Sequence, residues 1–405
     1  MSTAAAAAGA APAPETGEVE TVSPLRAFVL HLWAFFLPAL TFIFLATGPH
    51  PWWQALLWIV PIWVLVWIDV RSPTDHRQPA EGTPAWPFDV QVYGLTALQI
   101  ANHIMLGVMA SKLAVWPAEN LGQTVANFFA MNAVSGVCAG YSGIVVAHEL
   151  IHRRNRFQFF LGRLLLMFVC YEHFATEHVR GHHPRVGTLR DPATARFGET
   201  FRQFFWRTVP AQFKSAWELE KVRNQLHETP WYSPRWLRHR VLQGVAAEVL
   251  IVAGYVFFFG WLAAFFFVMQ ARMAIMLLEV VNYIEHWGLL RRGKTVTNLD
   301  SWDTDKWFTL YTLVGLSRHS DHHARASRPY QMLRHFDESP KMPSGYYGTI
   351  VLALMRNEEF RKIATSELKR RKLGPFREDG DAPGAATQAI GEPAGAGGAA
   401  VPQPA

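Results

Sequence analysis

Cysteine is nearly absent from this sequence, since Cys138 and Cys170 are the only two among 405 residues. Both stand inside long apolar runs. Two thiols cannot build a disulfide framework, a cysteine-type zinc site, or the four-cysteine site of an iron–sulfur cluster or a rubredoxin-like module. We therefore interpret both as small core residues.

Basic residues are missing from the first 22 positions, which contain three glutamates and much alanine and proline. This stretch lacks the basic start and the apolar centre of a signal peptide, and its composition predicts disorder. Residues 377–405 are rich in alanine, glycine and proline, with one arginine against four acidic residues. We predict disordered tails at 1–23 and 377–405 around a folded unit at 24–376. Without its acidic tails, this unit is more basic than the whole-chain charge of +6.

Five long apolar runs dominate the first three quarters of the chain, at 25–47, 52–68, 90–115, 124–146 and 241–286. A helix needs about 20 apolar residues to cross a hydrocarbon core of about 30 Å. The first four runs are close to that length, and the fifth is long enough for a hairpin of two spans that turns near 259–261. The sequence therefore predicts an all-α polytopic membrane protein with six transmembrane helices. A shorter run at 157–171 predicts a buried or interfacial helix.

Lysine and arginine are also absent from the turns on one side of the predicted membrane, at 48–51, 116–123 and 259–261. The other side holds a large set of basic residues: Arg26, Arg71, Arg77, Arg153, Arg154, Arg156, Arg180, Arg291, Arg292 and Lys294. Because cytoplasmic loops carry an excess of positive charge, we expect both termini in the cytoplasm.

Histidine, by contrast, is clustered on that cytoplasmic side. Four short motifs contain nine histidines: HELIH at 148–152, EHVRGHH at 177–183, NYIEH at 282–286 and RHSDHH at 318–323. Residues i and i+4 of a helix share one face, so His148 and His152 can bind one metal ion. In the second motif the same spacing predicts that His178 and His182 bind one ion, while His183 turns toward a neighbouring one.

Nine imidazoles are too many ligands for a single ion. Split five and four, they suit two ions, each with an open position, and neutral imidazole binds iron, copper, zinc and nickel. We expect neighbouring carboxylates to accept hydrogen bonds from the outer ring nitrogens and not to bind metal themselves. These carboxylates are Glu149, Glu177, Glu285 and Asp321, with Glu279 as a further support. We assign no ligand role to the other eight histidines, among them His173.

Together these motifs resemble the bacterial membrane alkane 1-monooxygenases, a branch of the fatty-acid-desaturase-like superfamily. The matching text is HELIHRR (148–154), EHVRGHH with VGTLRDPATAR (177–196), LLEVVNYIEHWGLLR (277–291), LSRHSDHHARASRPYQMLR (316–334) and PSGYYG (343–348), with a weaker DHRQPAE (75–81). The resemblance spans roughly residues 25–355.

The resemblance implies six membrane helices in the bacterial inner membrane and a cytoplasmic helical cap that holds a histidine-only di-iron site. It implies O2-dependent hydroxylation of medium- and long-chain n-alkanes to 1-alkanols. Electrons are implied to come from a separate rubredoxin or ferredoxin with an NAD(P)H-dependent reductase. The implied iron ligands are His148, His152, His178, His182, His183, His286, His319, His322 and His323.

Several departures from the family pattern leave the substrate open. Ser317, Trp287 and Leu189-Arg190 replace the usual residues at positions that are not ligands. A xylene- or cymene-type aryl-methyl monooxygenase and a fatty-acyl desaturase or hydroxylase are therefore alternatives. A membrane zinc protease would use HELIH with Glu149 as its base, but it would leave six histidines without a purpose. A metal carrier would need ionisable groups along a path through the membrane, and Arg272 is part of the only hint of one.

An apolar substrate is expected to wait in the bilayer, since eight carbons gain about 6 kcal/mol on leaving water at about 0.8 kcal/mol per CH₂. The second span is unusually rich in tryptophan, with indoles at 52, 53, 58, 63 and 67. We predict that Trp58 or Trp63 projects into a substrate channel and limits the chain length. The alternative is that both side chains face lipid or fill space between helices.

Overall fold

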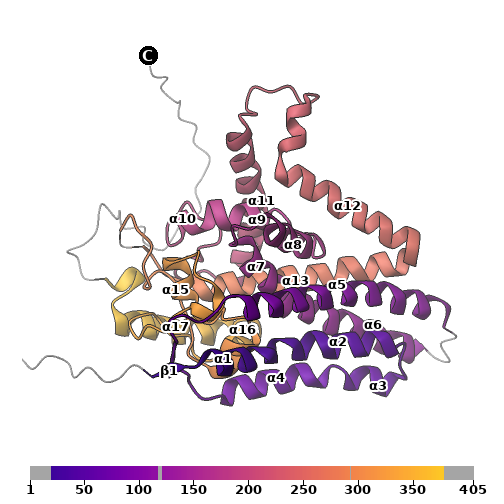
Figure 1. Cartoon of the computed structure of the whole chain (residues 1–405), viewed down its shortest axis with the longest axis horizontal. Coiled ribbons are helices and arrows are strands. Elements are labelled where there is room, and N and C mark those ends of the chain that lie inside the picture. Colours follow the sequence, from indigo (N-terminus) through magenta and orange to yellow (C-terminus); the bar gives the residue numbers. More distant parts are fainter. Residues whose placement is uncertain (1–19, 117–120, 292, 378–405) are drawn as a thin grey trace, which may run out of the picture.

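The structure is a computed structural model that describes residues 20–116, 121–291 and 293–377. Both predicted tails lie outside these residues, except for 20–23 and 377. Residues 20–23 belong to the folded part, because β1 (Thr21–Val22) pairs in parallel with β2 (Gln78–Pro79) and the Ser23 hydroxyl caps the first helix by accepting from the Arg26 amide. Apart from this short pairing, helices dominate the described residues (Figure 1).

Six helical spans are long and apolar enough to cross a membrane, and they lie where the apolar runs predicted them: Pro24–Thr47, Trp52–Arg71, Trp86–Val115, Leu121–Ile151, Arg240–Phe259 and Trp261–His286. The predicted all-α, multi-pass membrane fold is thereby confirmed. In the labels of Figure 1 these spans are α1 (Pro24–His31) with η1 (Leu32–Phe35) and α2 (Phe36–Thr47), α3 (Trp52–Leu57) with α4 (Val60–Arg71), α5 (Trp86–Val115), α6 (Leu121–Cys138) with η2 (Ala139–Ile144) and α7 (Val145–Ile151), α12 (Arg240–Phe259), and α13 (Trp261–His286).

The fourth span is the centre of the bundle, with 83% of its most apolar window buried. It packs closely on α13 because two glycines, four residues apart, leave room for the neighbouring helix. A Cβ atom at Gly136 would lie 2.6 Å from Met273, and one at Gly140 would lie 2.7 Å from Leu277. The span also contains a π-helical turn, η2, of a kind that occurs frequently at functional sites.

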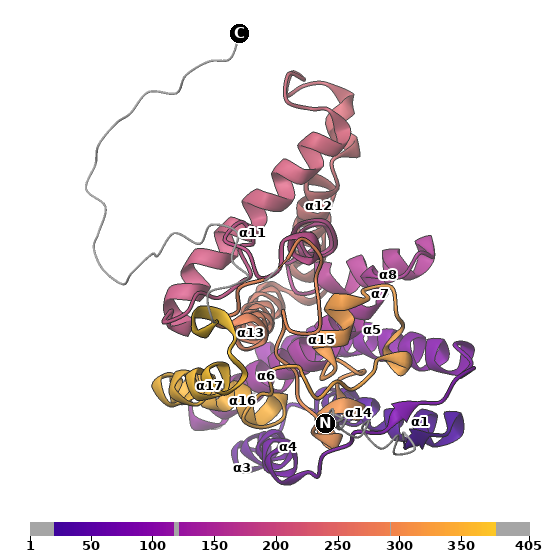
Figure 2. The ribbon, with the colours of Figure 1, turned by 90° about the vertical axis from the view of Figure 1, so that its left-hand side faces the viewer.

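The remaining elements lie outside these spans, and most of them gather at the end of the bundle that faces the viewer in Figure 2. They are α8 (Arg156–Met167), α9 (Phe174–Glu177), η3 (His178–His182), α10 (His183–Arg185), α11 (Phe201–Asn224), η4 (Pro234–Arg238), α14 (Trp307–Thr312), α15 (His319–Ala324), η5 (Tyr330–Met332), α16 (Tyr346–Met355), α17 (Asn357–Arg371) and η6 (Gly374–Phe376). Helix α8 corresponds to the short helix predicted at 157–171. We did not predict α11, a polar helix of 24 residues that extends away from the bundle together with the start of α12 (Figure 1).

Candidate metal centre

All nine motif histidines meet at the capped end of the bundle, although they come from four motifs that are separate in the sequence. His148 lies in the last turn of α7 and His152 directly follows that helix. The second motif forms η3 and the start of α10, His286 ends α13, and the fourth motif forms α15. Six of the nine are buried, and His148, His152 and His183 are partly exposed. The tertiary fold thus brings the four motifs together.

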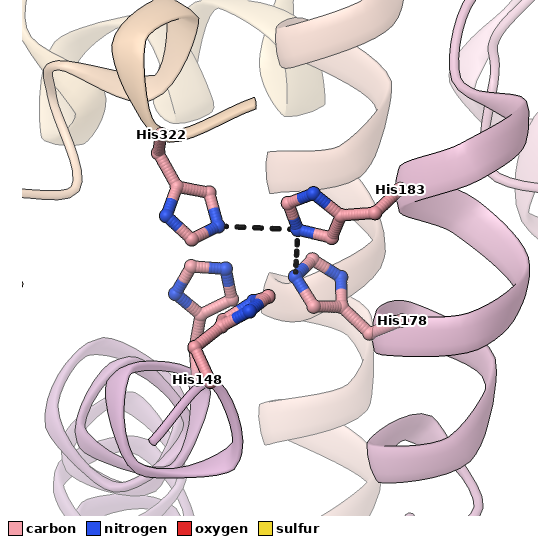
Figure 3. Close-up of side chains that lie close together, drawn as sticks. His148, His178, His183 and His322 are labelled. Atoms are coloured by element: carbon pink, nitrogen blue, oxygen red, sulfur yellow. Dashed lines mark hydrogen bonds between the residues drawn. The ribbon is translucent and has the colours of Figure 1, made fainter. Parts of the chain in front are cut away.

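Five of the histidines form one group: His148, His152, His178, His183 and His322. Their candidate ligand atoms all lie within 4.8 Å of one another. The Nε2 atom of His183 is 3.0 Å from Nε2 of His178 and 3.2 Å from Nε2 of His322 (Figure 3).

The other four histidines form a second group beside the first. Ligand atoms of His182, His286 and His323 lie within 4.8 Å of one another. His319 joins them through its Nε2 atom, which is 3.0 Å from Nε2 of His323, and His182 Nε2 is 3.3 Å from the same atom. The nine imidazoles therefore divide into five and four.

The division within the second motif differs from our prediction. His178 shares its group with His183, and His182 belongs to the other group. The reason is that η3 is a π-helical turn, in which the His183 amide donates to the carbonyl of His178, five residues earlier. The wider turn brings residues i and i+5 together, whereas we had assumed the i, i+4 spacing of an α-helix.

The hydrogen-bonding state of the rings fits metal binding. The buried Nε2 atoms of His148, His152 and His286 have no hydrogen-bond partner in the described part of the chain. Two nitrogens bound to one ion at about 2.1 Å, 90° to 109° apart, would lie roughly 3.0–3.4 Å from each other, as the close pairs here do. Burial also lowers the pKa of His178 and His322 well below 6.5. Both rings are therefore neutral, which is the form that binds a metal.

The carboxylate of Glu285 lies beside a ring nitrogen that faces the other imidazoles. Glu285 Oε2 is 3.2 Å from Nε2 of His319, the same nitrogen that faces His323. The other oxygen of Glu285 accepts a hydrogen bond of 2.7 Å from the Tyr346 hydroxyl. Our prediction that Glu285 contacts an outer ring nitrogen is therefore wrong, because α13 ends with this side chain beside the second group.

Two other predicted supports bind arginines instead of histidines. Glu149 pairs with Arg153 at 2.5 Å, and Asp321 pairs with Arg325 at 3.0 Å and Arg328 at 2.5 Å. Glu149 directly follows His148 in the chain, and Asp321 directly precedes His322. Because successive helical residues point about 100° apart, neither shares the histidines' face.

Glu177 and Glu279 lie close to the site without a contact to a ligand candidate. The Glu177 carboxylate packs against the backbone of η3, where a Cβ atom at Gly181 would lie 2.5 Å from it, and burial raises its pKa to about 7. Glu279 accepts from Tyr171 at 2.9 Å and from Gln212 at 2.9 Å, so it ties α13 to α11. These contacts fit a supporting role for Glu279, which stays a prediction.

His173 and a third cluster stand apart from the nine histidines. His173 packs against Tyr171, with ring centroids 4.2 Å apart, and burial lowers its pKa to about 3. The ring of His335 lies between two carboxylates, those of Asp305, at 2.6 Å, and of Asp337. The ammonium group of Lys341 is 3.2 Å from the same Asp305 oxygen. Because an ammonium group already neutralises this cluster, we interpret it as an ion-pair network.

Asp191 is a functional residue that our sequence reasoning missed. Its Oδ2 atom lies 2.9 Å from Nδ1 of His182 and accepts a hydrogen bond of 2.6 Å from the Thr194 hydroxyl. Burial opposes its ionisation, but His182 and Thr194 lower the pKa of Asp191 below its usual value. The carboxylate therefore orients His182 with Nε2 toward the second group. The only signal was its place in the VGTLRDPATAR text, nine residues beyond His182.

A narrow apolar cavity adjoins both histidine groups. We call it the inner cavity; His148, His178, His319 and Glu285 form its metal-facing end. The rest of its wall is almost entirely apolar and comes from η2, α7, α9, α13 and the segment after α14: Gly140, Tyr141, Ile144, Val145, Phe174, Leu277, Leu278, Val281, Asn282, Leu313 and Leu316. A hydrocarbon could lie here with one end at the imidazoles.

Neither predicted channel tryptophan lines the inner cavity. Trp63 is 57% exposed on the outside of α4. Trp58 packs against Phe44 and His50, with ring centroids 5.8 Å from each. Neither indole therefore stops a chain within the inner cavity, and a limit that either sets elsewhere along a channel stays a prediction. The second span has only 17% of its most apolar window buried and lies at the edge of the bundle.

Comparison with known proteins points to the same family as the histidine motifs. The Fatty acid desaturase family matches residues 124–350, which include all nine histidines. Alkane 1-monooxygenase 2 of Pseudomonas aeruginosa is 36% identical over 308 residues, which cover 75% of this chain and 81% of that protein. The chain belongs to the fatty acid desaturase family, in its alkane 1-monooxygenase branch.

Two further members of this family illustrate the range of similarity. Alkane 1-monooxygenase 1 of Pseudomonas aeruginosa is 44% identical over 226 residues, covering 54% of this chain and 58% of that protein. The hydroxylase component of the xylene/toluene monooxygenase of Pseudomonas putida is 28% identical over 237 residues, covering 57% of this chain and 62% of that protein. Of the candidates that we considered from the sequence, the alkane and the xylene-type enzymes are thus both represented, and these alkane relatives are more similar.

The Asp191–His182 contact leads to a first prediction for this family member. We expect Asp191→Asn to lower activity or metal affinity roughly 10- to 100-fold, as loss of an outer-sphere carboxylate does in other metal sites. Metal content and turnover of the purified variant measure this. Asp337→Asn is the control, because its side chain is 90% exposed. Full activity and full metal content in Asp191→Asn would contradict the role.

Proposed function

We propose that the protein is an O2-dependent terminal hydroxylase of medium- and long-chain n-alkanes, with two irons held by the nine histidines. The observation that carries this proposal is the position of the inner cavity, an apolar space whose only strongly polar end consists of imidazoles from both groups and of Glu285. The alkane 1-monooxygenase relatives support the substrate class.

The inner cavity would orient the substrate for attack at its end. Its apolar wall gives no hydrogen bond to a chain, so binding depends on the burial of CH₂ groups and on shape. The close packing of η2 on α13 at Gly140 keeps the cavity narrow. A straight chain that enters end first then presents its terminal carbon to the imidazole end.

The protein residues supply binding, orientation and the exclusion of water. When bound, a pair of irons would supply the reductive activation of O2 that inserts one oxygen atom into a C–H bond. The overall reaction consumes the alkane, O2, two electrons and two protons, and yields the 1-alkanol and water. The neutral imidazoles described above remain ligands and need not take part in proton transfer, and no protein nucleophile is required.

Assays on three substrate classes test this function directly. Membrane-purified protein with a matched electron-transfer system should hydroxylate n-alkanes at the terminal carbon, with a higher kcat/KM than for alkyl-benzenes or acyl lipids. A preference for the methyl group of alkyl-benzenes would favour the second candidate, which the 28% identical xylene/toluene relative supports. Desaturation or hydroxylation of acyl lipids alone would contradict both.

Metal analysis provides the second prediction. Because the nine histidines divide into five and four, we expect two irons per chain. Elemental analysis of protein purified from the membrane measures the number. One zinc per chain without iron would contradict the di-iron proposal and favour a protease that uses His148 and His152 as ligands.

We further propose that the histidine end of the bundle faces the cytoplasm of the bacterial inner membrane. The distribution of lysine and arginine among the predicted loops supports this orientation. A cysteine-accessibility experiment tests it: a cysteine in place of exposed Lys294 should react with a membrane-impermeant maleimide only after the cells are opened.

The third prediction concerns the electron donor. A chain with only Cys138 and Cys170 cannot hold a four-cysteine iron–sulfur or rubredoxin site, so NADH-driven turnover should require an added rubredoxin or ferredoxin and a reductase. If the acidic donor docks on the basic end, turnover at limiting donor should fall as salt rises toward 1 M, where the Debye length is about 3 Å. NADH-driven turnover by the purified chain alone would contradict the separate donor.

A further inference from the structure

Three apolar spaces adjoin one another between the metal centre and the outside of the bundle. The inner cavity shares Tyr141 with a second space, the outer cavity, which is lined by Trp33, Ala34, Phe36, Leu37, Leu65, Tyr141, Ser142, Thr312 and Tyr347. The outer cavity in turn shares Trp33 and Phe36 with a lateral groove, lined by Val29, Leu32, Trp33, Phe35, Phe36 and Ala39. A row of shared residues therefore connects the imidazole end to the surface.

The lateral groove opens on the membrane-facing surface of the first span. Trp33 is 45% exposed and Phe36 is 43% exposed, although both are large apolar side chains. The groove residues begin five positions after the start of this span at Pro24 and end fifteen after it, or about 8–22 Å along the helix at 1.5 Å per residue. This depth places the groove beside the acyl chains of a bilayer.

Tyr141 forms the partition between the inner and outer cavities. It lies in the π-helical turn η2, and its ring packs edge-on against Tyr347, with centroids 4.7 Å apart and planes at 65°. Tyr347 is fixed by a hydrogen bond of 3.2 Å from its hydroxyl to the Thr312 hydroxyl oxygen. One partner of the pair is thus anchored to the cap, and rotation of the Tyr141 ring would join the two cavities.

We propose that the apolar substrate reaches the metal centre sideways from the bilayer, through the lateral groove and the outer cavity, and that Tyr141 is the gate. The proposal rests on the proposed function for the identity of the substrate. An apolar chain favours this path because it stays among mainly apolar side chains. The gate makes Tyr141 and Leu65 specificity-determining residues, although neither contacts the histidines.

A pair of neighbouring substitutions on α4 tests the path. Leu65 is 4% exposed and lines the outer cavity, whereas Val64 is 45% exposed and faces away from it. We expect Leu65→Trp to lower kcat/KM for n-alkanes at least tenfold with iron content unchanged, and Val64→Trp to change it less than twofold. Equal kcat/KM values for the two iron-loaded variants would overturn the path.

Photolabelling of the wild-type protein tests the path without turnover and without a risk of misfolding. A hydrocarbon that carries a diazirine is added to the full chain in lipid vesicles, and labelled residues are identified by mass spectrometry. We expect label on buried Leu37 and Leu65, which line the outer cavity and not the inner one, and excess n-alkane should reduce this label at least fivefold. Label in the inner cavity without competable label at these two residues would overturn the path.

The two experiments separate this proposal from the proposed function. Competable label on Leu37 and Leu65 in a protein that hydroxylates no alkane would support the path and refute the function. Alkane hydroxylation without such label would support the function and refute the path. Tyr141→Ala adds a check on the gate: it should raise kcat/KM for methyl-branched relative to straight alkanes at least tenfold, and an unchanged ratio would refute the gate.

Discussion

Replacing His182 or His322 by alanine is expected to abolish hydroxylation, because each removes one ligand candidate from a different group. His322 Nε2 lies 3.2 Å from the Nε2 atom of His183, and His182 Nε2 lies 3.3 Å from the Nε2 atom of His323. The loss should exceed the roughly 10- to 100-fold effect of removing an outer-sphere partner. Iron content should also fall below two per chain, which elemental analysis of the purified variants measures.

The control for these variants must be a histidine without structural contacts. His227→Ala serves, because this residue is exposed beyond the end of α11. His50 is unsuitable: it is buried, and its Nε2 atom lies 2.9 Å from the carbonyl of Phe44. If either His182→Ala or His322→Ala kept full activity and two irons, that histidine would not be a ligand.

Filling the inner cavity is expected to have the next largest effect. Val281 lines this cavity on α13, one residue before Asn282 and within two turns of Glu285. In a fitted apolar pocket a single methylene changes kcat/KM by roughly 10- to 200-fold. Because an indole is much larger, we expect Val281→Trp to lower kcat/KM for n-alkanes at least about 100-fold. Iron content should remain two, since Val281 is not a ligand candidate.

Val268→Trp is the matched control on the same helix. Val268 is 48% exposed and does not line the cavity, so the same substitution there should leave turnover within about twofold. The comparison of kcat/KM and iron content in the two variants separates blocked binding from damaged folding. Normal alkane turnover by iron-loaded Val281→Trp would mean that the substrate binds elsewhere.

The membrane helices could be predicted because their cause is local. The first span requires only a run of about 20 apolar residues between polar turns, and so does each of the two helices of the α12–α13 hairpin. The polar helix α11 could not be predicted in this way, since it lacks such a run and is held by its cap at Thr200 and by contacts such as that of Gln212 with Glu279.

The hypothesis that a tryptophan limits the channel shows what an apolar sequence pattern leaves undecided. Trp58, Trp63 and Tyr141 are all aromatic residues within membrane spans, and the sequence does not distinguish a lipid-facing ring from one in a cavity. Burial makes the distinction: Trp63 is 57% exposed, whereas Tyr141 is 6% exposed and lines both cavities. Which face of a span points inward depends on the neighbouring helices.

The sequence by itself determined the helical membrane fold, the family and the nine histidines, because apolar length and residue type are properties of each segment alone. Tertiary structure decided which histidines form each group, since the π-helical turn at His178–His182 changes the spacing from four residues to five. It also decided that Glu285 faces the site, that Asp191 orients His182, and that Glu149 pairs with Arg153. Such choices depend on distances between segments far apart in the chain, which close packing fixes only after the helices have assembled.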